Sequence, residues 1–243
     1  PTLGVAPFDV PGALASPDLT LYSGAGAPLA SDAAWGGGGS LLSAFAQTGA
    51  FALPAGSADS AVLTTVSAGA YTSQVVGVGS AVGVALAEIY DADTGTPSAN
   101  LVNISARASV GPGADVLIAG FVVEGPAPTR VLLRGIGPSL GALPFNIPGA
   151  LPSATIILNA SPGGLVAANT GWGNPPTVST LNLSGDFRQA SASDMTAVGA
   201  FSIPNGSADS AMVATLTPGA YTLTLSGAGG ATGIALVEVY LYP

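Results

Sequence analysis

Short apolar runs, separated by turns rich in glycine and proline, follow one another along the chain of 243 residues. Residues 101–109 show the pattern most clearly, because apolar side chains such as Val102 and Ile104 alternate with polar ones. Residues 115–124 form an almost continuous apolar run between two turns, and residues 130–136 form a third short run. Alternation with a period of two predicts β-strands, and no window of comparable length keeps the 3.6-residue period of a helix.

The chain also contains an internal repeat. Residues 51–90 recur as residues 201–240 without a gap, and 21 of these 40 positions are identical. Residues 1–36 recur as residues 138–173, at an offset of 137 instead of 150. The second copy therefore holds 13 additional residues between its two blocks, which we expect to form a longer surface loop.

Both copies carry the same series of short strand-like runs. The predicted strands are 19–22, 61–66, 71–76 and 84–90 in the first copy, and 156–158, 211–216, 221–225 and 234–240 in the second. This arrangement predicts an all-β protein with two tandem antiparallel β-sandwich modules of jelly-roll type, joined by an extra strand segment. The modules are residues 1–91 and 138–243, and residues 92–137 comprise a polar linker followed by the extra strands.

The amino-acid composition excludes most common classes of catalytic site. The chain has 13 acidic residues, four arginines and no lysine, histidine or cysteine, which gives a net charge of −9. It therefore lacks the residues for a Ser-His-Asp triad, a thiolate nucleophile, a Schiff base or a zinc site with nitrogen or sulfur ligands, and we expect no enzymatic activity. Four arginines cannot neutralise a run of phosphates, which disfavours nucleic acid as a partner.

Several features favour a location outside the cell. No uninterrupted stretch of 18 apolar residues occurs, so we expect no membrane span. The chain opens at Pro1 without a methionine or a leader, as a mature or trimmed product would. An acidic chain rich in threonine, serine and glycine is typical of an extracellular or cell-surface protein, and without cysteine it cannot rely on disulfides for stability.

Three stretches carry a resemblance to known proteins. They are PDLTLYSGAGAPLASDAAWGG from Pro17, LTTVSAGAYTSQVVGVGSAVGVALAEIY from Leu63, and NISARASVGPGADVLIAGFVVEGPAPTRVLLRGIGPSLGA from Asn103. The chain resembles the bacterial pre-peptidase C-terminal type of domain, and also the tandem β-sandwich repeats of very large secreted bacterial proteins. The resemblance implies a non-catalytic β-sandwich that is secreted or bound to the cell surface.

Domains related to the pre-peptidase type often bind calcium through acidic loop residues. Asp18 and Asp32 fall at those acidic positions in the first module, whereas the second module has Thr155 and Asn169 there. Calcium requires six or more oxygen ligands, several of them charged. The resemblance therefore implies a candidate Ca²⁺ site in the first module and argues against one in the second. No other cofactor is expected.

Four acidic residues recur in both copies: Asp59 and Asp209 within the motif GSADSA, and Glu88 and Glu238 within the last strand of each module. A functional interpretation would make them a catalytic pair or metal ligands. A structural interpretation is favoured, because a catalytic pair needs two differently tuned carboxylates and these recur identically. We expect the aspartates to accept hydrogen bonds from their own loops, and the glutamates to lie in a polar outer row of the sheet.

Two tryptophans are duplicated as well, Trp35 and Trp172, each in a loop flanked by glycine. They are candidates for stacking against a sugar; alternatively, each indole plugs one end of its sandwich, which their duplication favours. Glycans could also be attached at four sequons, which are Asn103, Asn159, Asn182 and Asn205.

The first module has no counterpart of the strands that precede the second module, and missing strands would leave apolar faces and open edges. The leading hypothesis is therefore an extracellular structural protein, a subunit of a head-to-tail homopolymer that forms a surface filament or layer by strand complementation between subunits. The residues expected at this joint lie in the extra strand segment and are Val102, Ile104, Arg107, Val116, Ile118, Arg130, Val131 and Arg134.

The alternative hypothesis is a non-catalytic carbohydrate-binding or calcium-dependent adhesion module of a large secreted protein. A glycosidase that works with two carboxylates is a third candidate, and no Asp or Glu pair outside the duplicated ones supports it.

Overall fold

The computed structural model describes residues 1–94, 100–179 and 186–243, and the chain divides into two compact units. Unit 1 is Pro1–Asn100 and unit 2 is Leu101–Pro243. The described residues form three antiparallel sheets, which confirms the predicted all-β class. No helix within the described ranges is long and apolar enough to cross a membrane.

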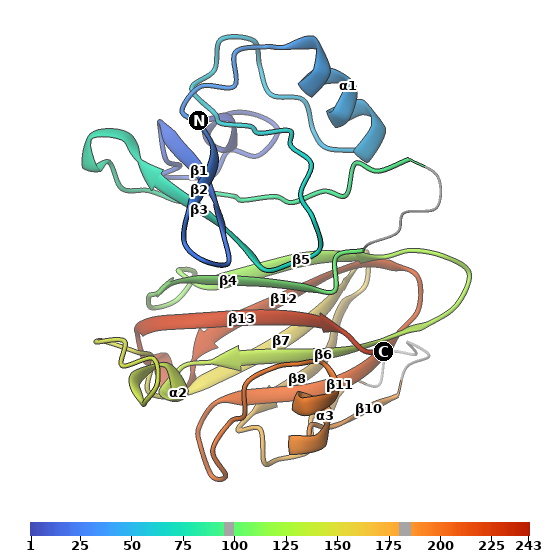
Figure 1. Cartoon of the computed structure of the whole chain (residues 1–243). Helices are drawn as coiled ribbons and strands as arrows, with labels where there is room; N and C mark the ends of the chain where they lie inside the picture. Colours follow the sequence, from blue (N-terminus) through green and yellow to red (C-terminus); the bar gives the residue numbers. More distant parts are fainter. Residues whose placement is uncertain (95–99, 180–185) are drawn as a thin grey trace. The chain divides into compact units, whose positions relative to one another are not determined.

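Unit 2 is a sandwich of two five-stranded sheets (Figure 1). One sheet has the order β10-β11-β6-β13-β4 and the other the order β5-β12-β7-β8-β9. The strands are β4 Asn103–Val110, β5 Leu117–Val123, β6 Thr129–Ile136, β7 Ala154–Ser161, β8 Gly164–Thr170, β9 Thr177–Val178, β10 Phe187–Gln189, β11 Ser210–Leu216, β12 Gly219–Gly227 and β13 Gly233–Leu241. The helices are α2 Pro138–Gly141, α3 Ala192–Ala197 and the 3₁₀ helix η3 Ala228–Gly230.

The main core of unit 2 lies between these two sheets. Leu133 of β6, Leu158 of β7 and Leu223 of β12 are fully buried there. Alternate residues of each strand point inward, as expected for strands with one face on a core. Of the three strands in the predicted extra segment, β4 and β6 lie in one of these sheets and β5 lies in the other.

A second apolar cluster covers the outer face of the sheet that contains β6. Leu132 and Ile136 of β6 pack there with Leu140 of α2 and Met195 of α3. On the inner face, a Cβ atom added at Gly135 would lie only 2.4 Å from a side-chain carbon of β7, so this position has room only for glycine. Strand β6 is thus tightly enclosed on both faces.

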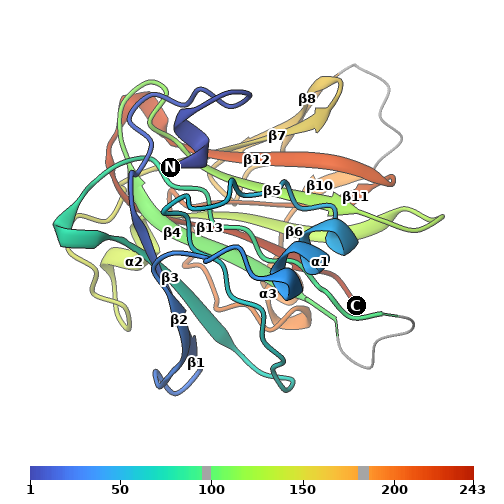
Figure 2. The same ribbon diagram turned by 90° about the horizontal axis from the view of Figure 1, so that it is seen from above.

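Strands β1, β2 and β3, labelled in Figure 2, form one three-stranded sheet in unit 1. Its order is β2-β1-β3, which corresponds by the repeat to β8-β7-β12 of unit 2. Its strands are β1 Pro17–Ser23, β2 Pro28–Asp32 and β3 Tyr71–Gly77. The helices of unit 1 are α1 Gly39–Thr48 and the 3₁₀ helices η1 Thr2–Gly4 and η2 Val78–Ser80. Within the described part of unit 1, no strands correspond to β4, β5 and β6.

Residues 61–66 and 84–90 are the largest departure from the predicted elements, and we call them the acceptor segments. The predicted strands at these positions are wrong: apart from one isolated bridge between Ala13 and Val84, neither segment takes part in a ladder. In unit 2 the equivalent residues form β11 and β13, and both pair with β6. The strand-like segments occur in both copies of the repeat, but among the described residues the strand that pairs with them, β6, occurs only in unit 2.

Two further expectations are corrected. Helix α1 was not predicted; it ends where Gly49 takes the left-handed conformation at φ 73°. The additional residues of the second copy do not simply form a surface loop, because strands β9 and β10 lie between Trp172 and Phe201 and have no counterpart among the described strands of unit 1. Asp194 caps α3 in a capping box and forms an ion pair of 2.6 Å with Arg188. The sequon at Asn182 lies outside the described residues.

Candidate functional site

The residues expected at an inter-subunit joint all lie in unit 2. Their positions are Ile104 and Arg107 in β4, Ile118 in β5, Arg130, Val131 and Arg134 in β6, and Val102 and Val116 just before β4 and β5. Strand β6 pairs along one edge with β11 and along the other with β13. Since these ladders are formed within one chain, β4, β5 and β6 already have partners.

Arg134 of β6 is fully buried and holds several elements together. Its Nε lies 2.9 Å from Oε2 of Glu238, directly opposite on β13. Its Nη1 donates a hydrogen bond of 2.7 Å to the carbonyl oxygen of Phe201, and the guanidinium carbon lies 4.1 Å from the centroid of the Phe201 ring. The Tyr240 hydroxyl donates to the other oxygen of Glu238 at 2.7 Å. Carboxylate, tyrosine and phenylalanine thus form a cage around the cation.

Burial determines the electrostatics of this cage. Burial raises the pKa of Glu238 above its usual value, although the positive charge of Arg134 opposes this effect. Burial also lowers the pKa of Arg134, although Glu238 opposes it. Each ion depends on the other, because a buried charge without its partner is strongly destabilising. The predicted polar outer row is wrong for Glu238, which lies on the outer face of the sheet but is covered and only 4% exposed.

Unit 1 contains the counterpart of this cage without an arginine. Its residues are Glu88, Tyr90 and Phe51, at the repeat positions of the three cage residues in unit 2. The Tyr90 hydroxyl donates to Oε1 of Glu88 at 3.0 Å. The Phe51 ring packs on Phe8 with a centroid distance of 4.9 Å, and the equivalent pair in unit 2 has the same distance. Partial burial raises the pKa of Glu88, and burial together with this neighbouring carboxylate raises the pKa of Tyr90 to about 12.

The acceptor segments begin at the same anchor points as β11 and β13. The Ala61 N–H donates to Oδ2 of Asp32 at 3.0 Å, and the Val84 N–H donates to the Gly12 carbonyl oxygen at 2.9 Å. The corresponding hydrogen bonds in unit 2 are 3.0 and 2.8 Å long. Both segments are therefore positioned at their starts as they would be in a complete sheet.

Beyond these anchors the acceptor segments expose apolar side chains. Leu63 is 49% exposed, whereas its counterpart Val213 in β11 is 2% exposed. Ile89 is 53% exposed, whereas its counterpart Val239 in β13 is 8% exposed. In unit 2, Val213 belongs to the apolar cluster on the outer face of the sheet and Val239 to the core between the two sheets.

The duplicated aspartates have structural contacts in both units. Asp59 accepts hydrogen bonds from the Thr2 hydroxyl at 2.5 Å and from the Ser57 hydroxyl at 2.8 Å. Burial would raise the pKa of Asp59, but hydrogen bonds from the Pro1 ammonium group, Thr2 and Ser57 outweigh it and lower the pKa. Asp209 makes the equivalent contacts in unit 2. These contacts favour the structural interpretation, with partners both inside and outside the aspartates' own loops.

The candidate calcium ligands do not converge. Leu19 lies directly opposite Asp32 in the β1–β2 ladder, so Asp32 shares a sheet face with Leu19 and the adjacent Asp18 points to the other face. Asp32 is also engaged by a backbone N–H of an acceptor segment. Among the described residues there is no group of three or more His, Cys, Asp or Glu that could hold a metal ion. Asp18 and Asp32 therefore do not form one cation site in this arrangement.

The two tryptophans are buried, at 4% exposure for Trp35 and 6% for Trp172. Their indole N–H groups donate to the carbonyl oxygens of Pro54 and Pro204, at 3.1 and 3.0 Å. A sugar-stacking platform needs an exposed ring face, so this burial favours the structural plug over the glycan platform.

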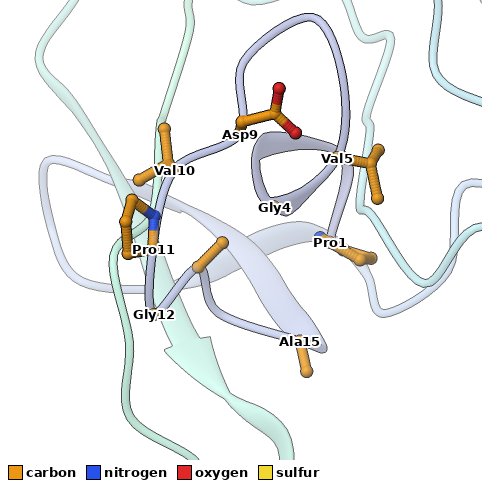
Figure 3. A pocket seen from close by; sticks show the side chains of 9 residues that line it. Pro1, Gly4, Val5, Asp9, Val10, Pro11, Gly12 and Ala15 are labelled. Atoms are coloured by element: carbon orange, nitrogen blue, oxygen red, sulfur yellow. The ribbon is translucent and has the colours of Figure 1, made fainter.

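A shallow pocket of about 420 Å³ lies in the first fifteen residues of unit 1. Val10 and Pro11 line one part of it, and Asp9 contributes a carboxylate (Figure 3). The lining residues are otherwise small or apolar, and they offer no pair of groups that could act together as acid and base.

The chain matches no family model, no curated protein and no solved structure. The resemblance to pre-peptidase C-terminal domains and to secreted tandem repeats therefore stays a prediction. The comparison that informs the site is internal, between the two copies of the repeat.

This internal comparison identifies two residues that sequence reasoning did not single out, Phe51 and Tyr90. Both are duplicated, as Phe201 and Tyr240, so the repeat contained a signal for them. What distinguishes them is that their counterparts in unit 2 both contact Arg134, which is distant from both in sequence.

Proposed function

We propose that this chain is a non-catalytic structural protein of an extracellular filament or surface layer. In this proposal unit 1 accepts a β4–β6-type segment from another repeat, and such strand complementation links successive repeats head to tail. The acidic composition, without lysine or cysteine, supports a place outside the cell.

A single observation carries the proposal: the acceptor segments occupy the repeat positions of β11 and β13 and begin at equivalent anchor points, and yet they remain exposed and outside any ladder apart from one isolated bridge. Exposed apolar strands with free backbone groups readily pair with another chain. The internal repeat indicates the kind of partner, because in unit 2 the equivalent strands β11 and β13 both pair with β6, and β13 also pairs with β4.

In this proposal the donor is a further repeat, because strands β4, β5 and β6 of residues 101–137 are already paired within unit 2. If two identical copies exchanged β4–β6, each exchange would supply these strands to one unit 1 and remove them from one unit 2. Such an exchange gains no strand pairs, so it offers little driving force. A β4–β6-type segment from another repeat adds pairs that no module loses.

The test adds a synthetic peptide with the sequence of Leu101–Gly137 to the full chain and measures amide hydrogen exchange by mass spectrometry. We expect exchange in both acceptor segments to slow strongly when the peptide is present, while residues 211–216 and 234–240 stay protected with or without it. Negative-stain electron microscopy of a chain extended by further repeats, each with its own β4–β6-type segment, should show an elongated, regular particle.

Two results would contradict the proposal. One is a monomer, by light scattering, whose acceptor segments are already as protected as β11 and β13 without any partner. The other is a peptide that leaves exchange in the acceptor segments unchanged at saturating concentration.

A further inference from the structure

We propose that Glu88, Tyr90 and Phe51 form an arginine socket, through which unit 1 recognises the central strand of an incoming β4–β6-type segment. This inference rests on the proposed function and adds the chemistry of the recognised partner: an extended apolar strand with an arginine at the position of Arg134.

The occupied cage of unit 2 shows what the socket would hold. There, Arg134 pairs with the carboxylate on the strand beside it, donates to the carbonyl oxygen of Phe201, and lies over the Phe201 ring. All three cage residues are identical in the repeat, and their own contacts are already formed in unit 1. The Tyr90 hydroxyl fixes one oxygen of Glu88, which leaves the other oxygen for a cation.

The surroundings of the socket suit a strand. Position 45 of α1 carries a phenylalanine where unit 2 has Met195, and the Phe45 ring lies 5.8 Å from that of the buried Trp35. This ring contact lies at the repeat positions of Met195 and Trp172, which belong to the apolar cluster on the outer face of the sheet in unit 2. In unit 2, β6 lies between β11 and β13, and the acceptor segments are the repeat equivalents of these two strands.

Arginine fits this socket better than lysine does. A guanidinium can pair with a carboxylate, donate to a backbone carbonyl and stack on an aromatic ring at the same time, because its donors lie in one plane. An ammonium group is a strongly hydrated point charge and loses more on burial. The socket therefore selects for strand register as well as for charge, since a shift by one residue would turn the arginine to the opposite face.

The experiment compares two peptides and three forms of the full chain. The peptides have the sequence of Leu101–Gly137, with Arg134 or with Arg134→Gln, and carry a fluorescent label for anisotropy. The chains are the unchanged protein, Glu88→Gln, and the matched control Glu124→Gln, which removes an exposed carboxylate of unit 2. The control is needed because a chain with a net charge of −9 attracts any basic peptide.

We expect Arg134→Gln in the peptide, or Glu88→Gln in the chain, to weaken binding by about tenfold or more, and the two changes together to weaken it little further. Glu124→Gln should leave the affinity unchanged within about twofold.

The two proposals fail differently in this experiment. Equal binding of both peptides, with the acceptor segments protected from exchange, would overturn the socket and leave strand complementation standing. Equal weakening by Glu88→Gln and Glu124→Gln would also overturn the socket, since it would reveal general attraction by charge. If neither peptide binds, strand complementation and the socket are both wrong.

Discussion

The two copies of the repeat carry the same glutamate in two environments, which allows a matched test of the buried ion pair. Glu238→Gln removes the charge that compensates Arg134, while Glu88→Gln makes the same change at a position without an arginine. Removing one partner of a buried pair typically costs about 3–5 kcal/mol. We expect about 3 kcal/mol for Glu238→Gln, because Arg134 keeps its hydrogen bond to a backbone carbonyl and its contact with an aromatic ring.

Glu88→Gln should change stability by about 0.5 kcal/mol or less in the isolated chain, as substitutions outside the core do. The measurement is urea unfolding with hydrogen exchange resolved by segment, since a chain of two units need not unfold in one step. Exchange in β6 and β13 should become faster for Glu238→Gln only.

A double variant separates charge compensation from packing. Arg134→Met combined with Glu238→Leu removes both ions, and we expect it to recover most of the stability lost in Glu238→Gln, since apolar residues often replace a buried pair at little cost. The reasoning would be refuted by a loss below about 1 kcal/mol for Glu238→Gln, or by a double variant less stable than that single variant.

Three further predictions concern the sandwich itself. Leu158→Ala should cost about 2–5 kcal/mol because its side chain is fully buried, whereas the equivalent change Leu21→Ala, at a half-buried position, should cost clearly less in thermal or urea unfolding. The hydrogen bond from Arg188 lowers the pKa of Asp194 below the usual 3.8. The stabilisation from the Asp194 carboxylate is therefore complete above pH 3.8 and is lost as the pH falls through the lowered pKa. Hydrogen exchange in α3 should become faster on acidification below about pH 4, and Asp194→Asn should abolish this dependence. Trp35→Ala and Trp172→Ala should each destabilise their unit by about 3–5 kcal/mol, and a glycan array should show no binding that depends specifically on either ring.

Local sequence was sufficient for strands whose pairing partners are present among the described residues of the same unit. Strands β1, β3 and β12 lie where turn signals and alternation predicted them, because each pairs with a neighbour within its own copy. The acceptor segments show the limit of this reasoning. Residues 61–66 have the alternating pattern of β11, but a strand also needs a ladder, and the required partner is not among the described residues of unit 1.

The site was only partly predictable for the same reason. Arg134 was singled out as a contact residue, but its partners are distant in sequence: Phe201 is reached through the fold and Glu238 through the pairing of β6 with β13. Glu88 and Glu238 are indistinguishable by local sequence, yet one is covered and ion-paired and the other is exposed. Whether this glutamate is buried depends on β6, which lies between β11 and β13 in unit 2 and is distant from both in sequence.

The charge of the open sheet also bears on which assemblies can form. Two unit 1 surfaces brought face to face in a symmetric dimer would place two Glu88 carboxylates on the shared surface, and the described residues of unit 1 include no arginine or lysine to compensate them. Like charges buried together cost several kcal/mol, so the same glutamate that attracts an arginine-bearing strand disfavours symmetric pairing. A surface that binds a different surface but not a second copy of itself forms heterologous interfaces. Heterologous interfaces produce filaments when the rotation between subunits does not close into a ring. In the proposed assembly, Glu88 therefore favours the addition of a repeat that carries an arginine-bearing strand over symmetric dimerisation.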